Sequence, residues 1–168
     1  MRICAQSFSG LVSVLLALLL LGPLAAQASD APLRWELRDG SGGRWGLVLF
    51  QQPDPTFPAG WRLRLLSRDP DLQLDHHRPL PMDDGMGGHW QLANRSEELV
   101  PHGNDDLPAQ AAQFDAEGLL PRPQAALPLR LLIPLAGAGA PAAGATSVVL
   151  GPEPVAALHG LPASPVGG

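Results

Sequence analysis

Hydrophobic and polar residues alternate most clearly over residues 33–52, and this pattern predicts a β-hairpin. Leu33, Trp35 and Leu37 alternate with charged residues, which is the period of a strand with one buried face. The glycine-rich segment 39–43 predicts a tight turn, after which a second apolar strand returns. This register places Leu37 opposite Trp45 and Trp35 opposite Leu47.

Shorter alternating segments follow the hairpin and predict an all-β fold. They cover residues 61–65, 71–76, 89–94, 127–135 and 146–150. Residues 109–114 are ambiguous between helix and strand, and we interpret them as a short strand. Prolines remove backbone donors, so we expect any strand through Pro81 to lie at an edge, and the strand 127–135 to lie at an edge or beside a bulge. Pro152 predicts the start of a short helix ending at His159. The fold class is therefore mainly antiparallel β, as a small sandwich or partly open barrel of about seven short strands with a short C-terminal helix.

The tryptophans and the longest polar segment complete this picture. Each of the four tryptophans lies on the inward register of its strand, and this position favours core packing. Their sequence positions are Trp35, Trp45, Trp61 and Trp90. Residues 95–107 are polar and acidic without a period, which is typical of a surface loop.

The N-terminus has the pattern of an export signal. Arg2 precedes an apolar run over residues 11–21, and Ala26-Gln27-Ala28 matches a small-residue cleavage site before Ser29. We therefore expect a cleavable signal peptide over residues 1–28, a single β-rich domain over 29–161, a disordered tail over 162–168, and no membrane span after cleavage. Removing 28 of the 168 residues would leave 140, enough for one domain.

Composition excludes several kinds of chemistry. The chain contains no lysine, so it can form neither a lysine phosphate loop nor a lysine Schiff base. Its one cysteine, Cys4, lies in the expected signal segment, which leaves no thiol for a disulfide or a thiolate metal site. The net charge of −5 argues against general nucleic-acid binding. No cofactor is predicted.

The arrangement of these segments resembles a family of uncharacterised exported proteins of cyanobacteria, known only as a domain of unknown function. The similarity lies in the Leu-Arg-Asp-Gly hairpin at 37–40, Trp45 to Phe50, the turn from Gln113 to Pro121, and the strand 129–135, and it extends from about residue 33 to 161. The resemblance implies a periplasmic or thylakoid-lumen location and no assigned activity. It transfers no functional residue.

Histidines and aspartates concentrate between residues 75 and 89 and are the candidates for a metal site. His76, Asp83 and His89 are ligand types that suit zinc or a similar ion. Adjacent His76 and His77 would point to opposite faces of a strand, so only one of them could join a given site. A metal-dependent enzyme or metal-binding protein is therefore the alternative hypothesis.

Arginines on the outward register of the first three strands support the leading hypothesis, which is a non-enzymatic binding or accessory module. These residues are Arg34, Arg38, Arg44, Arg62 and Arg64. In a meander they would share one face and could dock an acidic protein surface or anionic lipid headgroups through guanidinium forks. We expect charge reversal at Arg62 and Arg64 to weaken such binding and to leave folding intact.

Overall fold

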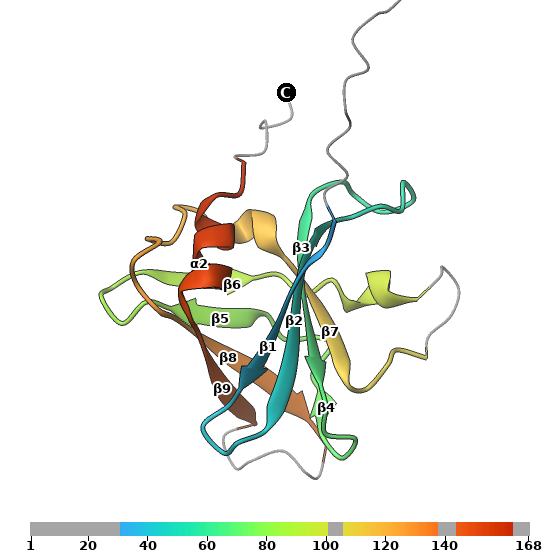
Figure 1. Ribbon diagram of the computed structural model, residues 1–168. Helices are drawn as coiled ribbons and strands as arrows, with labels where there is room; N and C mark the ends of the chain where they lie inside the picture. Colours follow the sequence, from blue (N-terminus) through green and yellow to red (C-terminus); the bar gives the residue numbers. More distant parts are fainter. Residues whose placement is uncertain (1–30, 101–105, 138–143, 163–168) are drawn as a thin grey trace, which may run out of the picture.

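The computed structural model describes residues 31–100, 106–137 and 144–162, which form two antiparallel sheets and one α-helix (Figure 1). The first sheet has the strand order β1-β2-β3-β7. Its strands are β1 (Leu33–Arg38), β2 (Arg44–Gln51), β3 (Trp61–Ser67) and β7 (Ala111–Asp115). The expected signal peptide and nearly all of the expected C-terminal tail lie outside the described residues.

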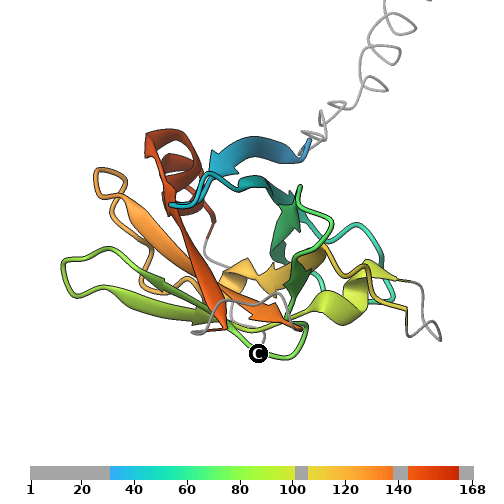
Figure 2. The same ribbon diagram turned by 90° about the horizontal axis from the view of Figure 1, so that it is seen from below.

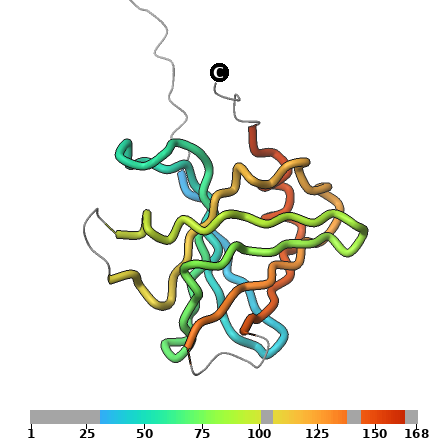
Figure 3. Tube along the Cα trace, turned by 180° about the vertical axis from the view of Figure 1, so that it is seen from behind, coloured from blue at the N-terminus to red at the C-terminus, as the bar shows by residue number. Residues whose placement is uncertain are grey.

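In the second sheet, β8 lies between β9 on one side and β4 and β5 on the other, and β6 pairs with β5. The strands are β4 (Gln73–Leu74), β5 (Leu80–Asp83), β6 (His89–Leu92), β8 (Leu129–Ala136) and β9 (Ala145–Leu150). Figure 3 shows the green β5–β6 hairpin beside the orange β8. The predicted all-β, mainly antiparallel class is confirmed, with nine strands in this part of the chain instead of about seven.

The expectation that Pro81 would confine its strand to a sheet edge is wrong, and so is the edge alternative for the strand 127–135. β5 contains Pro81 yet lies between β6 and β8. The proline is tolerated there because β5 pairs with β8 only through Met82 and Asp83, so Pro81 has no partner on β8. β8 contains Pro134 yet is also an inner strand. β5 pairs with Arg130 and Leu131 whereas β4 pairs with residues 135–136, so Pro134 falls between the two partners.

The β1–β2 hairpin has the predicted register, with Trp35 opposite Leu47 and Leu37 opposite Trp45. Its turn is organised by the buried Asp39, whose Oδ1 accepts hydrogen bonds from the backbone N–H groups of Ser41 at 2.9 Å and Gly43 at 2.8 Å. Its Oδ2 accepts a hydrogen bond from Nε1 of Trp45 at 3.0 Å. Burial would raise the pKa of Asp39, but the side-chain and backbone donors of Ser41, Trp45 and Gly43 lower it to about 2.

The two sheets approach each other at both sides and share one apolar core, without forming a closed barrel (Figure 2). Single bridges join Asp39 to Val148 on one side and Asn94 to Phe114 on the other. Trp45 and Trp90 lie in the core as predicted, whereas Trp35 and Trp61 are only partly buried against it. The core prediction therefore holds for two of the four tryptophans.

The described residues include three short helices. α2 (Pro152–His159) has its predicted bounds and buries Val155 and Leu158. Two 3₁₀ helices, η1 (Ser96–Leu99) and η2 (Ala116–Gly118), flank β7 in the sequence. Among the described residues, no helix is long and apolar enough to cross a membrane.

Candidate functional site

The outer face of β1, β2 and β3 carries the five arginines predicted from the alternation, and we call it the arginine face. Cross-strand register places their side chains in rows, because paired residues point to the same side of a sheet. One row runs from Arg34 through Val48 to Arg64 and ends at Gln113 of β7. The next row toward the start of β1 pairs Phe50 with Arg62, and the opposite end pairs Arg38 with Arg44.

Arg62 is buried, with 1% of its surface exposed, and its guanidinium binds a buried carboxylate. Its Nε lies 2.7 Å from Oε2 of Glu98 and its Nη2 lies 2.9 Å from Oε1, so the ion pair is bidentate. Nη2 also donates to the carbonyl of Pro58 at 2.7 Å. Burial would lower the pKa of Arg62, but the hydrogen bonds and the charge of Glu98 raise it.

Glu98 belongs to η1, and its carboxylate accepts hydrogen bonds from three side chains. Besides Arg62, the amides of Gln52 and Gln113 donate to Oε2 at 2.6 Å and 2.7 Å. Burial would raise the pKa of Glu98, but these hydrogen bonds lower it. The expectation of an exposed Arg62 is therefore wrong, because η1 and the loop after β2 cover its outward position.

Arg64 is partly buried and held in one orientation. Its Nε and Nη2 donate to Oε1 of Gln113 at 3.0 Å and 2.6 Å. Its guanidinium carbon lies 4.8 Å from the centre of the Phe50 ring. Burial lowers the pKa of Arg64, and the positive charge of nearby Arg34 lowers it further.

Arg34, Arg38 and Arg44 are exposed, and none has a hydrogen-bond or ion-pair partner among the described residues. Half of the ten arginines in the described part of the chain form ion pairs with carboxylates: Arg62, Arg68, Arg95, Arg122 and Arg130. The other half consists of Arg34, Arg38, Arg44, Arg64 and Arg78. Four of these five share the arginine face, in a chain whose net charge is −5.

A groove with a volume of about 390 Å³ crosses this face between Arg34 and Arg64. Its apolar lining includes Val48, Phe50 and Leu66, and the first two are only 7% and 8% exposed although they point outward. The sequence does contain a signal for this groove. Residues 47–50 of β2 are all apolar, and an unbroken apolar run indicates a strand covered on both faces.

The residues proposed for a metal site are not gathered into one. Nε2 of His76 lies 2.9 Å from the carbonyl of Ala111, while Asp83 forms an ion pair with Arg130 at 3.0 Å. His89 is opposite Asp83 on β6 and is exposed. In residues 31–100, 106–137 and 144–162, no three His, Cys, Asp or Glu side chains form a group that could hold a metal ion.

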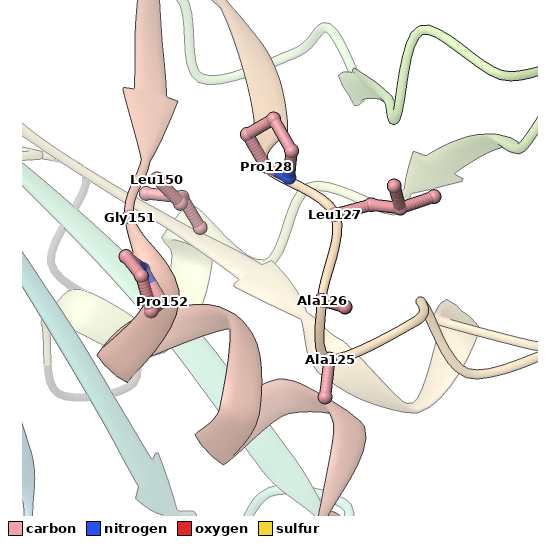
Figure 4. Close-up of a pocket in the computed structure, with 7 residues that line it drawn as sticks. All are labelled: Ala125, Ala126, Leu127, Pro128, Leu150, Gly151 and Pro152. Atoms are coloured by element: carbon pink, nitrogen blue, oxygen red, sulfur yellow. The ribbon is translucent and has the colours of Figure 1, made fainter.

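A second hollow, with a volume of about 200 Å³, lies where β9 leads into α2 (Figure 4). Its lining is apolar and contains no ionisable side chain: Ala125, Ala126, Leu127, Pro128, Leu150, Gly151 and Pro152. Such a hollow offers neither an acid, a base nor a nucleophile. The groove on the arginine face differs from this hollow, because it combines an apolar floor with the guanidinium groups of Arg34 and Arg64.

Comparison of the sequence with known families places the chain in a family whose function is not assigned. Residues 32–146 match the family model described as a protein of unknown function, DUF3122, and the chain belongs to this family. The match contains the whole arginine face, Glu98 and Gln113, and it ends before most of β9 and all of α2. No curated protein and no solved structure matches the chain.

Proposed function

We propose that this protein is an exported, non-enzymatic binding or accessory module that docks an anionic partner through the arginine face. The observation that carries the proposal is the concentration of arginines without carboxylate partners on one side of one sheet. Like charges on neighbouring strands repel, so folding alone favours mixing them with carboxylates. A partner that supplies carboxylates or other anionic groups would relieve this repulsion through charge-assisted hydrogen bonds.

The residues that would contact the partner are Arg34, Arg38, Arg44 and Arg64. Arg62 would not contact the partner, because both oxygens of Glu98 already bind its guanidinium. Arg68 is also committed, since it lies 2.6 Å from the carboxylate of Glu36 on the same face. The docking surface is thus smaller than the five arginines that the sequence suggested.

A pull-down from the native extracytoplasmic fraction, with captured proteins identified by mass spectrometry, tests the docking proposal. We expect Arg38→Glu to abolish capture of a specific acidic protein and high salt to weaken it, because the contact is electrostatic. Arg78→Glu is the matched control. Arg78 is exposed, has no ion-pair partner among the described residues, and lies outside the arginine face, where it donates to the Gly144 carbonyl at 3.2 Å. Equal capture by wild type and Arg38→Glu at every salt concentration would contradict the proposal.

Export has its own test. We expect N-terminal sequencing of the protein from its native compartment to begin at Ser29, because Ala26 and Ala28 are the small residues that a signal peptidase requires. A chain in that compartment that retains Met1 would contradict the predicted cleavage.

A further inference from the structure

We infer that the groove between Arg34 and Arg64 binds an extended acidic segment of a partner protein, in which an apolar side chain precedes a carboxylate by two residues. This inference rests on the proposed function and specifies the partner. Its first basis is the placement of the two arginines on either side of Val48 in one cross-strand row. A carboxylate above Val48 would lie between two positive charges that repel each other in the free protein.

Arg64 is built as the anchor of this site. The Gln113 amide donates to buried Glu98 and therefore turns its oxygen toward Arg64, where it accepts from Nε and Nη2. A guanidinium has five N–H donors, so three remain at the end formed by Nη1 and Nη2. This end can bind a carboxylate bidentately, and its orientation is fixed before the partner arrives, which lowers the entropic cost of binding.

The apolar floor of the groove favours an apolar side chain next to the carboxylate of the ligand. Phe50 lies one row beyond Val48, and Pro32, Pro53 and Leu66 complete the apolar lining. In an extended peptide the side chains on one face are two residues apart, like the rows of the sheet. An apolar side chain in contact with the part of Phe50 that Arg64 does not cover would therefore place the side chain two residues later above Val48, between the arginines.

The far end of the face fixes a second position. Arg38 follows Arg34 by four residues, a distance of about 13 Å along a strand. A second carboxylate four residues after the first would then reach Arg38 and Arg44. At the opposite end the groove is lined by Asp54, whose negative charge orients the acidic end of the segment away from it.

The recessed floor favours a peptide over a lipid surface. Val48 and Phe50 are nearly covered, whereas Arg34, Arg38 and Arg44 project from the same face. A flat bilayer would contact the projecting arginines and would leave the floor empty. A single apolar side chain on a flexible segment can enter the groove.

The test uses the peptide acetyl-Leu-Ser-Glu-Ser-Ser-Ser-Glu-amide, titrated into the protein and followed by NMR at the arginine Nε–H resonances. We expect Arg34 and Arg64 to shift, and both Arg64→Lys and Arg34→Gln to weaken binding at least about tenfold, since each removes part of a charge-assisted contact. Replacing the first glutamate of the peptide by glutamine should have a similar effect. Arg78→Gln is the control and should bind like wild type, and thermal unfolding checks that each variant folds.

Three outcomes would overturn the inference. Equal binding of the peptide by wild type, Arg64→Lys and Arg34→Gln would show that the groove does not recognise it. The second outcome is that the protein binds phosphatidylglycerol vesicles but not the peptide, and that Arg38→Glu abolishes vesicle binding. This result would overturn the inference of a peptide ligand but would leave the proposal of an anion-docking face in place. If neither probe binds and Arg38→Glu leaves the pull-down unchanged, the proposed function fails as well.

Discussion

The arginine face has a buried carboxylate near each end, and the two carboxylates are satisfied in opposite ways. Glu98, at one end, receives the guanidinium of Arg62 on both oxygens. Asp39, in the turn between Arg38 and Arg44, receives the N–H groups of its own loop and of Trp45, together with the hydroxyl of Ser41. Glu98 therefore neutralises an arginine of the face, whereas Asp39 leaves its two neighbouring arginines without a partner.

This difference shows that outward register alone does not decide what an arginine does. Arg62 and Arg38 both lie on the outer side of an antiparallel sheet, yet one is covered by η1 and the other meets solvent. The loss of stability on removing either buried carboxylate should therefore depend on the groups that bind it, which are a charged guanidinium for Glu98 and neutral donors for Asp39. Altering an exposed arginine should affect stability much less.

The largest effect is expected for Glu98→Ala. This change leaves the buried Arg62 with only a longer ion pair, to Asp115 at 3.8 Å, and deprives the amides of Gln52 and Gln113 of their acceptor, so it should lower the free energy of unfolding by about 3 to 5 kcal/mol. Urea denaturation at neutral pH measures the loss. Glu97→Ala is the matched control, because Glu97 is the preceding residue of η1 and its carboxylate is exposed. A loss below about 1 kcal/mol for Glu98→Ala would mean that water reaches the guanidinium of Arg62.

A smaller, pH-dependent effect is expected for Asp39→Asn. The pKa of Asp39 lies at about 2 in the folded state, below the ordinary value of 3.8. The carboxylate thus contributes about 2 kcal/mol of stability above pH 4, and this contribution is lost as the pH falls toward 2. Asp39→Asn removes the charge, so the stability difference between wild type and variant should shrink over that range.

Urea unfolding of both proteins at several pH values between 2 and 6 measures this difference. Asp71→Asn, in the exposed turn before β4, is the control and should change stability at neutral pH by no more than about 0.5 kcal/mol. A difference between wild type and Asp39→Asn that is the same at pH 2 and pH 6 would contradict the assigned role of the carboxylate.

Much of the fold was predictable because its signals are local. The hairpin register follows from the period of two and the length of the 39–43 turn, and α2 follows from Pro152 at its start. The expected edge positions of Pro81 and Pro134 failed for a nonlocal reason. A strand can change partners along its length, and β8 does so between β5 and β4.

The candidate site was predictable only in part. Alternation placed all five arginines on one face, but the burial of Arg62 depends on Glu98, which is 36 residues away in a segment expected to be a surface loop. Nothing in the local pattern of residues 95–107 distinguishes Glu98 from exposed Glu97. The groove had a local signal in the unbroken apolar run of β2, because Val48 and Phe50 occupy outward positions that solvent alone would make polar.

The smallest expected change is a gain in stability for Arg44→Glu. Arg38 and Arg44 are directly paired across the hairpin, and like charges in that position repel. A glutamate at 44 would form an ion pair with Arg38 but would also lose the attraction between Arg44 and Glu36, so the net gain in stability should be small, about 0.2 kcal/mol and at most about 1 kcal/mol, as measured by thermal unfolding at low salt.

The double variant Arg38→Glu/Arg44→Glu restores a like-charge pair and should lose this gain, which separates the cross-strand interaction from a general change in net charge. High salt should reduce the gain as well. A stability for Arg44→Glu equal to or below that of wild type at low salt would mean that the two arginines do not repel across the hairpin. A measured gain would show that the native residues at this end of the face are not those that best stabilise the fold, which is the behaviour expected of a surface retained for binding.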